Sequence, residues 1–257
     1  MDIYQHFRPE EKDFIDQVLG WAEQVREQYA PKLTDFLNPR EAEIIRMLIG
    51  KEGDVRVSFF GGGENAERKR AILYPDYYTP DEEDYEIAFY QLSYPSKFAT
   101  IDHRQMLGTL MSLGVKRELY GDIWIEGETV QFAVERTIAA YMEANLTKVG
   151  NIGVKCRSIS STQLIEVNES WKELPITSSS LRLDNVIANA VSFSRQKSQM
   201  LIGQGRVKVN HRQIESSSYE LKQGDVISIR GTGRIKVLAI DGKTKRDKWK
   251  IVIGLQK

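Results

Sequence analysis

The sequence predicts an α+β protein of three domains. Three observations support this: helical and strand periods alternate along the first two thirds of the chain, an acidic loop interrupts them near residue 80, and the last third is strongly basic. We place the domains at residues 1–78, 79–174 and 181–257. Residues 175–180 read as a linker, because a proline precedes a Thr-Ser-Ser-Ser run there.

The composition is that of a folded protein without a membrane segment. Hydrophobic residues make up 41% of the 257 residues, which is enough for a substantial core. The start, "MDIYQHFRPEEKDF", lacks the charged and apolar regions of a signal peptide, and no apolar run approaches the ~20 residues of a membrane helix. A single cysteine, Cys156, fits a reducing compartment. We therefore expect a cytoplasmic protein.

The net charge of zero hides an asymmetry along the chain. Residues 181–257 carry 16 basic and 6 acidic side chains, whereas residues 1–180 carry 20 basic and 30 acidic ones. A basic module joined to an acidic body indicates a polyanionic partner, although terminal domains are often basic without one.

The N-terminal domain is predicted as helices followed by strands. Residues 10–29 carry an apolar stripe at helical spacing, and Asn38 can cap a second helix that Pro39 begins. "VRVSFF" alternates as a strand, and the glycines at 61–63 turn the chain. The following stretch, "ENAERKRAILYP", reads as a short helix and then a strand.

The middle domain has a regular rhythm. A strand, "YEIAFYQLSY", leads to a helix that Asp102 caps and Gly114 ends; two strands, "DIWIE" and "TVQFAV", are separated by a tight turn at Gly127. A helix over 135–147 and a last strand, "IGVKCRSI", complete the segment. The order βαββαβ is that of ferredoxin-like and RNA-recognition folds.

The basic domain begins with two short helices. Apolar residues recur at helical spacing from Leu183 to about Val191, and Ser194 stands where the cap of a second helix belongs. Gly205 permits a sharp turn into the strand "VKVN", and the sheet continues through "LKQGDVISIRGTGRIKVLAI".

Basic side chains occupy the positions that this apolar pattern leaves outside: Arg182, Arg195, Lys197, Arg206, Lys208, Arg212, Arg230 and Arg234. Arg195 and Lys197 fall in the first turn of a helix, where cations oppose the positive end of the helix dipole. An incoming phosphate would find helix N–H groups and two cations at that place. The sequence therefore predicts an anion site there.

The stretch "LRLDNVIANAVSFSRQKSQMLIGQGRVKVNHRQIESSSYELKQGDVISIRGTGR" resembles the small RNA-binding domain, with its alpha-L motif, first described in ribosomal protein S4. The matching elements are "RLD", "SR", "I-x-x-G-x-V-x-V-N" and "GD-x-I-x-x-x-G". The resemblance implies that the RNA face consists of Arg182, Ser194, Arg195, Lys197, Arg206, Lys208 and Asn210. It also implies that Asp184 orients neighbouring cations rather than touching RNA.

The whole chain is similar to the YlmH family of Gram-positive bacteria, with "MDIYQHFR", "ERKRAILYP" and "GVKREL-x-GDI" as the matching stretches outside the basic domain. This resemblance implies association with the large ribosomal subunit and tRNA. It also implies a role in ribosome-associated quality control of stalled nascent chains.

Two further basic clusters are weighed as secondary RNA contacts: Arg68, Lys69 and Arg70, and Lys116 with Arg117. The alternatives are a solvated helix face for the first cluster and a favourable helix C-terminal charge pair for the second. The second alternative is preferred for Lys116 and Arg117.

Other candidates are interpreted as structural. The glycines at 61–63 lack the lysine and hydroxyl residue of a P-loop and are read as a turn. Tyr90, Tyr94 and Phe132 could stack bases on a bare sheet, but we interpret them as packing residues, since "TVQFAVER" does not match the consensus of the RNA-recognition motif.

No metal site is expected, because three scattered histidines and one cysteine do not have the spacing of metal ligands. The acidic residues Glu82, Glu83 and Asp84 are read as a solvated loop rather than catalytic carboxylates, and no catalytic constellation or cofactor site is expected. The preferred hypothesis is a non-enzymatic RNA-binding factor that docks on the large ribosomal subunit and tRNA. One alternative is a pseudouridine synthase, although the "RLD" at 182–184 lies in the basic domain. Another is a cell-division or other interaction protein, recruited through residues 1–180.

Overall fold

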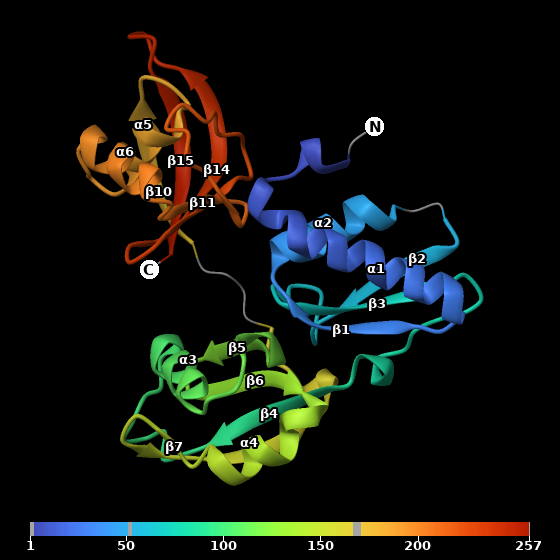
Figure 1. Ribbon diagram of the computed structural model, residues 1–257. Coiled ribbons are helices and arrows are strands. Elements are labelled where there is room, and N and C mark those ends of the chain that lie inside the picture. The colour runs from blue at the N-terminus through green and yellow to red at the C-terminus, as the bar shows by residue number, and fades with distance from the viewer. Residues whose placement is uncertain (1–2, 51–52, 167–170, 257) are drawn as a thin grey trace. The chain divides into compact units, whose positions relative to one another are not determined.

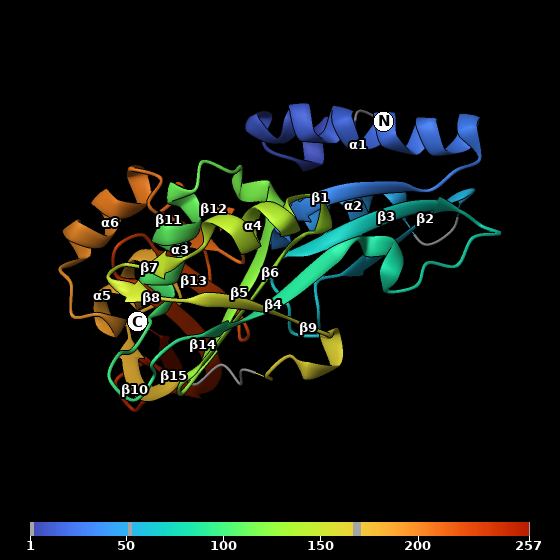
Figure 2. The ribbon, with the colours of Figure 1, turned by 90° about the horizontal axis from the view of Figure 1, so that it is seen from below.

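The computed structural model describes residues 3–50, 53–166 and 171–256. The chain divides into two compact units, Met1–Val167 and Asn168–Lys257. The first unit contains the predicted N-terminal domain and residues 79–167 of the predicted middle domain, and the second contains the rest of that domain and the predicted basic domain. Figures 1 and 2 show the helices and strands of each unit from two directions.

The N-terminal part is a three-stranded antiparallel sheet with two helices on one face. The helices are α1 (Lys12–Gln28) and α2 (Pro39–Ile49), and the strands β1 (Lys32–Leu37), β2 (Val55–Phe60) and β3 (Lys69–Pro75) are arranged in the order β1-β3-β2. Asn38 caps α2 as predicted, accepting hydrogen bonds from two backbone N–H groups. The apolar stripe of α1 packs on the sheet (Figure 2).

One expectation for this part was wrong, and one strand was not foreseen. Residues 64–68 form no helix, and the strand β3 begins at Lys69. The strand β1 was not predicted, because its residues lack the alternation of apolar and polar side chains. Its pairing with β3 shifts register between Leu33 and Phe36. This irregularity buries Phe36 and Leu37 in succession, so the residues show no strand-like alternation.

The middle part confirms the predicted ferredoxin-like order. Its strands are β4 (Ile87–Ser93), β5 (Tyr120–Glu126), β6 (Thr129–Glu135) and β9 (Lys155–Ile159), and they form an antiparallel sheet in the order β5-β6-β4-β9. The helices α3 (His103–Ser112) and α4 (Ala139–Asn145) cover one face. A small hairpin, β7 (Lys148–Val149) and β8 (Ile152–Gly153), precedes the last strand.

The other face of this sheet is covered by the N-terminal part. Phe36 and Ile72, from β1 and β3, pack against Phe89 and Ala133, from β4 and β6. Gln131, also on this face, is buried and donates to the carbonyl oxygen of Gln163 at 3.0 Å. Because both faces are covered, the two predicted domains share a core.

A buried ion pair crosses the same junction. Arg70 and Glu135 are each 4% exposed, and the Arg70 Nη2 lies 3.3 Å from the Glu135 Oε1. Arg70 also donates to the carbonyl oxygens of Thr34, Tyr85 and Glu86. Burial raises the pKa of Glu135 to about 7 against the opposing effect of Arg70. The guanidinium group of Arg70 is thus hydrogen-bonded to carbonyl oxygens of both the N-terminal and the middle part.

The second unit is a six-stranded antiparallel sheet with two helices on one face. The strands, in spatial order, are β10 (Lys172–Ser178), β15 (Trp249–Gln256), β14 (Gly233–Lys243), β13 (Val226–Ile229), β11 (Val207–Val209) and β12 (Arg212–Gln213). The helices are α5 (Leu183–Ala190) and α6 (Arg195–Gly203), which lie on one side of the sheet (Figure 1). Their apolar residues pack with the inward residues of the strands from β10 to β11.

The predicted linker at 175–180 was wrong. Residues from Lys172 to Ser178 form β10, which pairs in continuous register with β15, from Lys172 opposite Leu255 to Ser178 opposite Trp249. Pro175 is compatible with this strand because β10 lies at the sheet edge.

The close packing at the first unit's junction predicts a contrast between two glycines. A Cβ at Gly121 would lie 2.8 Å from both the Ala133 Cβ and a ring carbon of Phe36, whereas a Cβ at Gly108, in α3, would meet nothing within 4 Å. We expect Gly121→Ala to destabilise the protein by about 1–3 kcal/mol. Gly108→Ala should stabilise it by about 0.5–1 kcal/mol through helix propensity.

Urea unfolding of the two variants and the wild type, followed by circular dichroism, measures both changes. Equal unfolding midpoints for the two variants would contradict the tight junction.

Candidate nucleic-acid interface

Asp184 lies at the centre of the contacts between the two helices of the second unit. Its side chain is 0% exposed although α5 is a short surface helix. The Asp184 Oδ1 accepts from the Nε of Arg182 at 3.1 Å. The Oδ2 accepts from the Nε of Arg195 at 3.0 Å and from the Nε2 of Gln199 at 2.8 Å. One carboxylate therefore ties the first turn of α5 to α6.

The surroundings of this carboxylate favour its ionised form. Burial by itself would raise the pKa of Asp184, but the hydrogen bonds from Arg182, Gln199 and Arg195 outweigh burial and lower it to about 2. The cations remain accessible from outside, since the side chains of Arg182 and Arg195 are 33% and 54% exposed. Asp184 thus orients two arginines at the surface, as the resemblance implied.

The start of α6 adds a third cation. Ser194 caps the helix by accepting from the Lys197 backbone N–H at 3.1 Å. The Lys197 Nζ lies 3.7 Å from the centroid of the Phe193 ring, and the Lys197 side chain is exposed. We call Arg182, Ser194, Arg195 and Lys197 the helix face. The ion pair with Asp184 explains why Arg195 is placed in the first turn of a helix. The unfavourable interaction with the helix dipole therefore indicates an anion site most clearly at Lys197.

The remaining predicted cations do not join this surface. Val207 and Val209 of β11 point into the core beneath the helices, so the alternation of the strand places Lys208 on the opposite side. Lys208 is paired with Ser228, and Ser228 is paired with Arg234. Arg234 is in turn paired with Gln256, which completes a row of four residues across the strands. We call the side of the sheet that carries this row the sheet face.

Arg206 and Arg230 continue the sheet face at the ends of β11 and β13. The Arg230 N–H donates to the Arg206 carbonyl oxygen at 3.0 Å, which extends the register of the two strands by one pair. Arg212, on the edge strand β12, is paired with Val209 and is exposed on the helix side of the sheet. The predicted RNA face is therefore divided between two sides of one sheet.

Asn210 has a structural role in this fold. Its Nδ2 donates to the Asp225 Oδ1 at 2.8 Å, and its Oδ1 accepts from the Val226 N–H at 2.9 Å. Its φ of 48° lies in the left-handed region, where asparagine is tolerated better than most residues. These contacts explain why asparagine occupies position 210: its side chain stabilises the turn after β11.

Three of the secondary basic candidates face the protein interior. Arg70 is the buried guanidinium of the domain junction. Arg68 donates to the carbonyl oxygens of Tyr120 and Phe36, and burial lowers its pKa. Burial also lowers the pKa of Arg117 to about 10, and its Nη1 donates to the Tyr120 carbonyl oxygen. These arginines donate hydrogen bonds to carbonyl oxygens at the junction, which favours a structural role over the secondary RNA contact weighed for them.

The two lysines of those clusters are placed differently. The Lys69 Nζ donates to the carbonyl oxygen of Glu64 at 2.9 Å, whereas Lys116 is exposed ahead of a short turn. The sequence could not separate Lys69 from Arg68 and Arg70, since the separation depends on which residues near β3 meet the middle part.

The aromatic residues of the middle part are packing residues, as interpreted. Tyr90 and Phe132 are buried and stacked with their ring centroids 5.5 Å apart, and Tyr94 donates to the Glu128 carbonyl oxygen. The glycines at 61–63 form a bend against the middle part, because a Cβ at Gly62 would lie 2.6 Å from the Phe89 ring.

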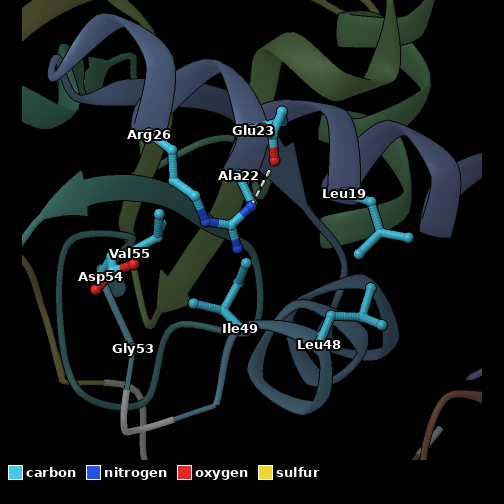
Figure 3. Close-up of a pocket in the computed structure, with 9 residues that line it drawn as sticks. All are labelled: Leu19, Ala22, Glu23, Arg26, Leu48, Ile49, Gly53, Asp54 and Val55. Carbon is cyan, nitrogen blue, oxygen red and sulfur yellow. Dashed lines mark hydrogen bonds and ion pairs between the residues drawn. The ribbon is translucent and has the colours of Figure 1, made fainter.

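Among the hollows lined by described residues, two of the best formed belong to the first unit. One, of about 270 Å³, is lined by Leu19, Leu48 and Ile49 between α1 and the end of α2, and its Arg26 is paired with Glu23 (Figure 3). The other, of about 530 Å³, lies beside Phe59 and Phe60. Neither brings together the charged groups that a nucleotide or metal ion requires. Within residues 3–50, 53–166 and 171–256, no three His, Cys, Asp or Glu residues form a group suited to a metal ion.

In the part of the chain that the structure describes, no helix combines the length and the apolar character needed to cross a membrane.

The two-helix module on a sheet, with an aspartate that presents arginines, defines a class of protein that carries an S4 domain: the model of that domain matches residues 181–227. Two further family models match parts of the first unit, "YlmH, N-terminal" over residues 10–78 and "Putative RNA-binding domain in YlmH" over residues 80–163. The chain belongs to the YlmH family.

Known relatives cover the whole chain or parts of it. The chain is 46% identical over 259 residues to the "Ribosome-associated protein quality control protein P2" of Bacillus subtilis, and the match covers 100% of this chain and 99% of that protein. The "Small ribosomal subunit protein uS4A" of Clostridium novyi is 30% identical over 42% of this chain and 50% of its own length. The solved "Cell division protein ylmH from Streptococcus pneumoniae" is 34% identical with a TM-score of 0.54, covering 64% of this chain and 99% of that one.

The contacts of Asp184 predict a pH-dependent contribution to stability. Because the pKa of Asp184 is lowered from 3.8 to about 2 in the folded protein, its ionised form stabilises the fold above pH 3.8. This contribution is lost as the pH falls from there towards 2. We expect Asp184→Asn to destabilise the second unit by about 2 kcal/mol at pH 7.

Urea unfolding at a series of pH values tests this. The difference between the variant and the wild type should shrink as the pH falls through this window. A difference that stays constant with pH would show that the carboxylate charge does not stabilise the fold.

Proposed function

We propose that this protein is a non-enzymatic RNA-binding factor that docks on the large ribosomal subunit and tRNA in quality control of stalled nascent chains. The observation that carries the proposal is the helix face, in which a buried carboxylate holds Arg182 and Arg195 at the surface beside Lys197. Guanidinium groups fixed in this way can meet phosphate oxygens without losing further side-chain freedom.

The relatives support the same reading. The Bacillus subtilis relative, similar over the full chain, is named for ribosome-associated protein quality control. Part of the chain is also 30% identical, over 114 residues, to a protein that is named as a component of the small ribosomal subunit. Such a face recognises the shape and phosphates of structured RNA more than its base sequence.

The enzymatic alternative is not favoured by the position of Asp184. A pseudouridine synthase needs an aspartate that can reach its substrate base. The only Arg-Leu-Asp of the sequence ends at Asp184, whose carboxylate is fully buried and accepts from three side chains. A role as an interaction or division protein is compatible with RNA binding, and its support is the name of the streptococcal relative alone.

The sharpest test of the helix face is Lys197→Glu in the full chain. Lys197 contacts the Phe193 ring and does not touch Asp184, so reversal of its charge leaves the buried network intact. Arg195→Glu would instead place a second carboxylate beside Asp184 and damage the fold. Loss of a phosphate contact and gain of repulsion should weaken co-sedimentation with large ribosomal subunits about tenfold or more at moderate salt.

A matched control is Lys222→Glu. Lys222 is an exposed lysine of the same unit that belongs to neither the helix face nor the sheet face. It should leave co-sedimentation nearly unchanged. Circular dichroism checks that both variants are folded. Equal binding by the two variants would contradict the proposal that the helix face docks on the ribosome.

A further inference from the structure

The sheet face, on the side of the sheet away from α5 and α6, carries several basic side chains and the carboxylate of Glu173. One row across the strands is Lys208, Ser228, Arg234 and Gln256. The next row is Val226, Lys236, Gly254 and Glu173. The first row holds no carboxylate, and Arg206 and Arg230 extend the surface at its end. The charge of this side is therefore suited to a polyanion.

An aromatic side chain lies within this basic surface. Trp171, just before β10, packs directly on Gly254: a Cβ at Gly254 would lie 2.6 Å from the Trp171 Cβ and 3.0 Å from its Cγ. The Lys236 Nζ lies 5.6 Å from the centroid of the Trp171 ring. Trp171 is only partly buried, so it offers an indole surface among cations.

The positions of Gly254 and Trp171 depend on each other. Any larger residue at Gly254 would displace the indole, and Lys236, paired with Gly254, places its ammonium group beside the ring. The S4 family model matches residues 181–227. Trp171 therefore precedes the match, and Lys236 and Gly254 follow it. The arrangement of Trp171, Lys236 and Gly254 thus lies outside the matched S4 segment, which contains the helix face.

We propose that the sheet face is a second RNA-binding surface, which takes a single-stranded segment: Trp171 stacks on an unpaired base and the cations of the two rows contact the backbone phosphates. This proposal rests on RNA binding by the protein and extends it to a different surface. An aromatic ring among cations is an arrangement by which single strands are held, since every base has a face for stacking. A duplex hides its base faces and could use only the charges.

Binding to two RNAs by the full-length protein tests the proposal. The probes are a fluorescently labelled oligonucleotide without self-complementarity and a transfer RNA, each measured by anisotropy at one fixed salt concentration. Trp171→Ala should weaken binding of the oligonucleotide about tenfold. Trp171→Phe, which keeps a ring, should retain most of the affinity, and Lys236→Glu should lose it.

The matched charge control is Lys172→Glu, next to Trp171 in the chain. The alternation of β10 places Lys172 on the other side of the sheet, and it is exposed. This variant should bind the oligonucleotide nearly as well as the wild type. Equal losses from Lys172→Glu and Lys236→Glu would overturn the proposal in favour of general charge attraction, and so would unchanged binding by Trp171→Ala.

The helix face is tested separately in the same assay. Lys197→Glu should weaken transfer RNA binding and leave the oligonucleotide bound, while Trp171→Ala should do the reverse. If Lys197→Glu has no effect on transfer RNA, the proposed use of the helix face fails while the sheet face stands. If the wild type does not bind the oligonucleotide at all, the sheet face proposal fails by itself.

Discussion

The buried carboxylate of Asp184 is the interaction on which the helix face depends. Two arginines near each other at the start of α5 and α6 would repel one another and adopt many rotamers in water. A shared carboxylate removes the repulsion and fixes both guanidinium groups, and the low pKa of Asp184 shows that these contacts outweigh the cost of burying the charge. The ion pairs also join the two helices, so the stability of the module and the geometry of its basic surface have one origin.

The first unit uses its basic residues in the opposite way. Arg68, Arg70 and Arg117 donate to carbonyl oxygens at the junction of the N-terminal and middle parts, where they contribute to cohesion rather than to a surface. The same junction covers the side of the β5-β6-β4-β9 sheet that corresponds to the base-stacking side of RNA-recognition folds, because Phe36 packs there against Phe89 and Ala133. The middle part therefore has the ferredoxin-like order without an open sheet, and any RNA contact it makes must use other surfaces.

The two sides of the second unit's sheet are complementary in character. The helix face presents cations held by hydrogen bonds and a helix cap, which suits the fixed phosphates of folded RNA. The sheet face presents cations in strand register around a partly exposed indole, which suits a flexible strand. Placed on opposite sides of one sheet, the two surfaces could engage different segments of RNA at once.

The sequence by itself determined the order of most elements, because the signals for them are local: Asn38 and Ser194 as caps, the periodicity of α1 and α5, and the βαββαβ rhythm of the middle part. It also located the basic domain. Tertiary structure decided which cations reach solvent, since Arg70 and Lys69 are neighbours in sequence yet meet different surroundings. It decided that Lys208 and Arg195 lie on opposite sides of a sheet, and it brought Trp171 onto Gly254, 83 residues away in the chain. Such pairings depend on strand register between distant segments, which no local pattern of residues encodes.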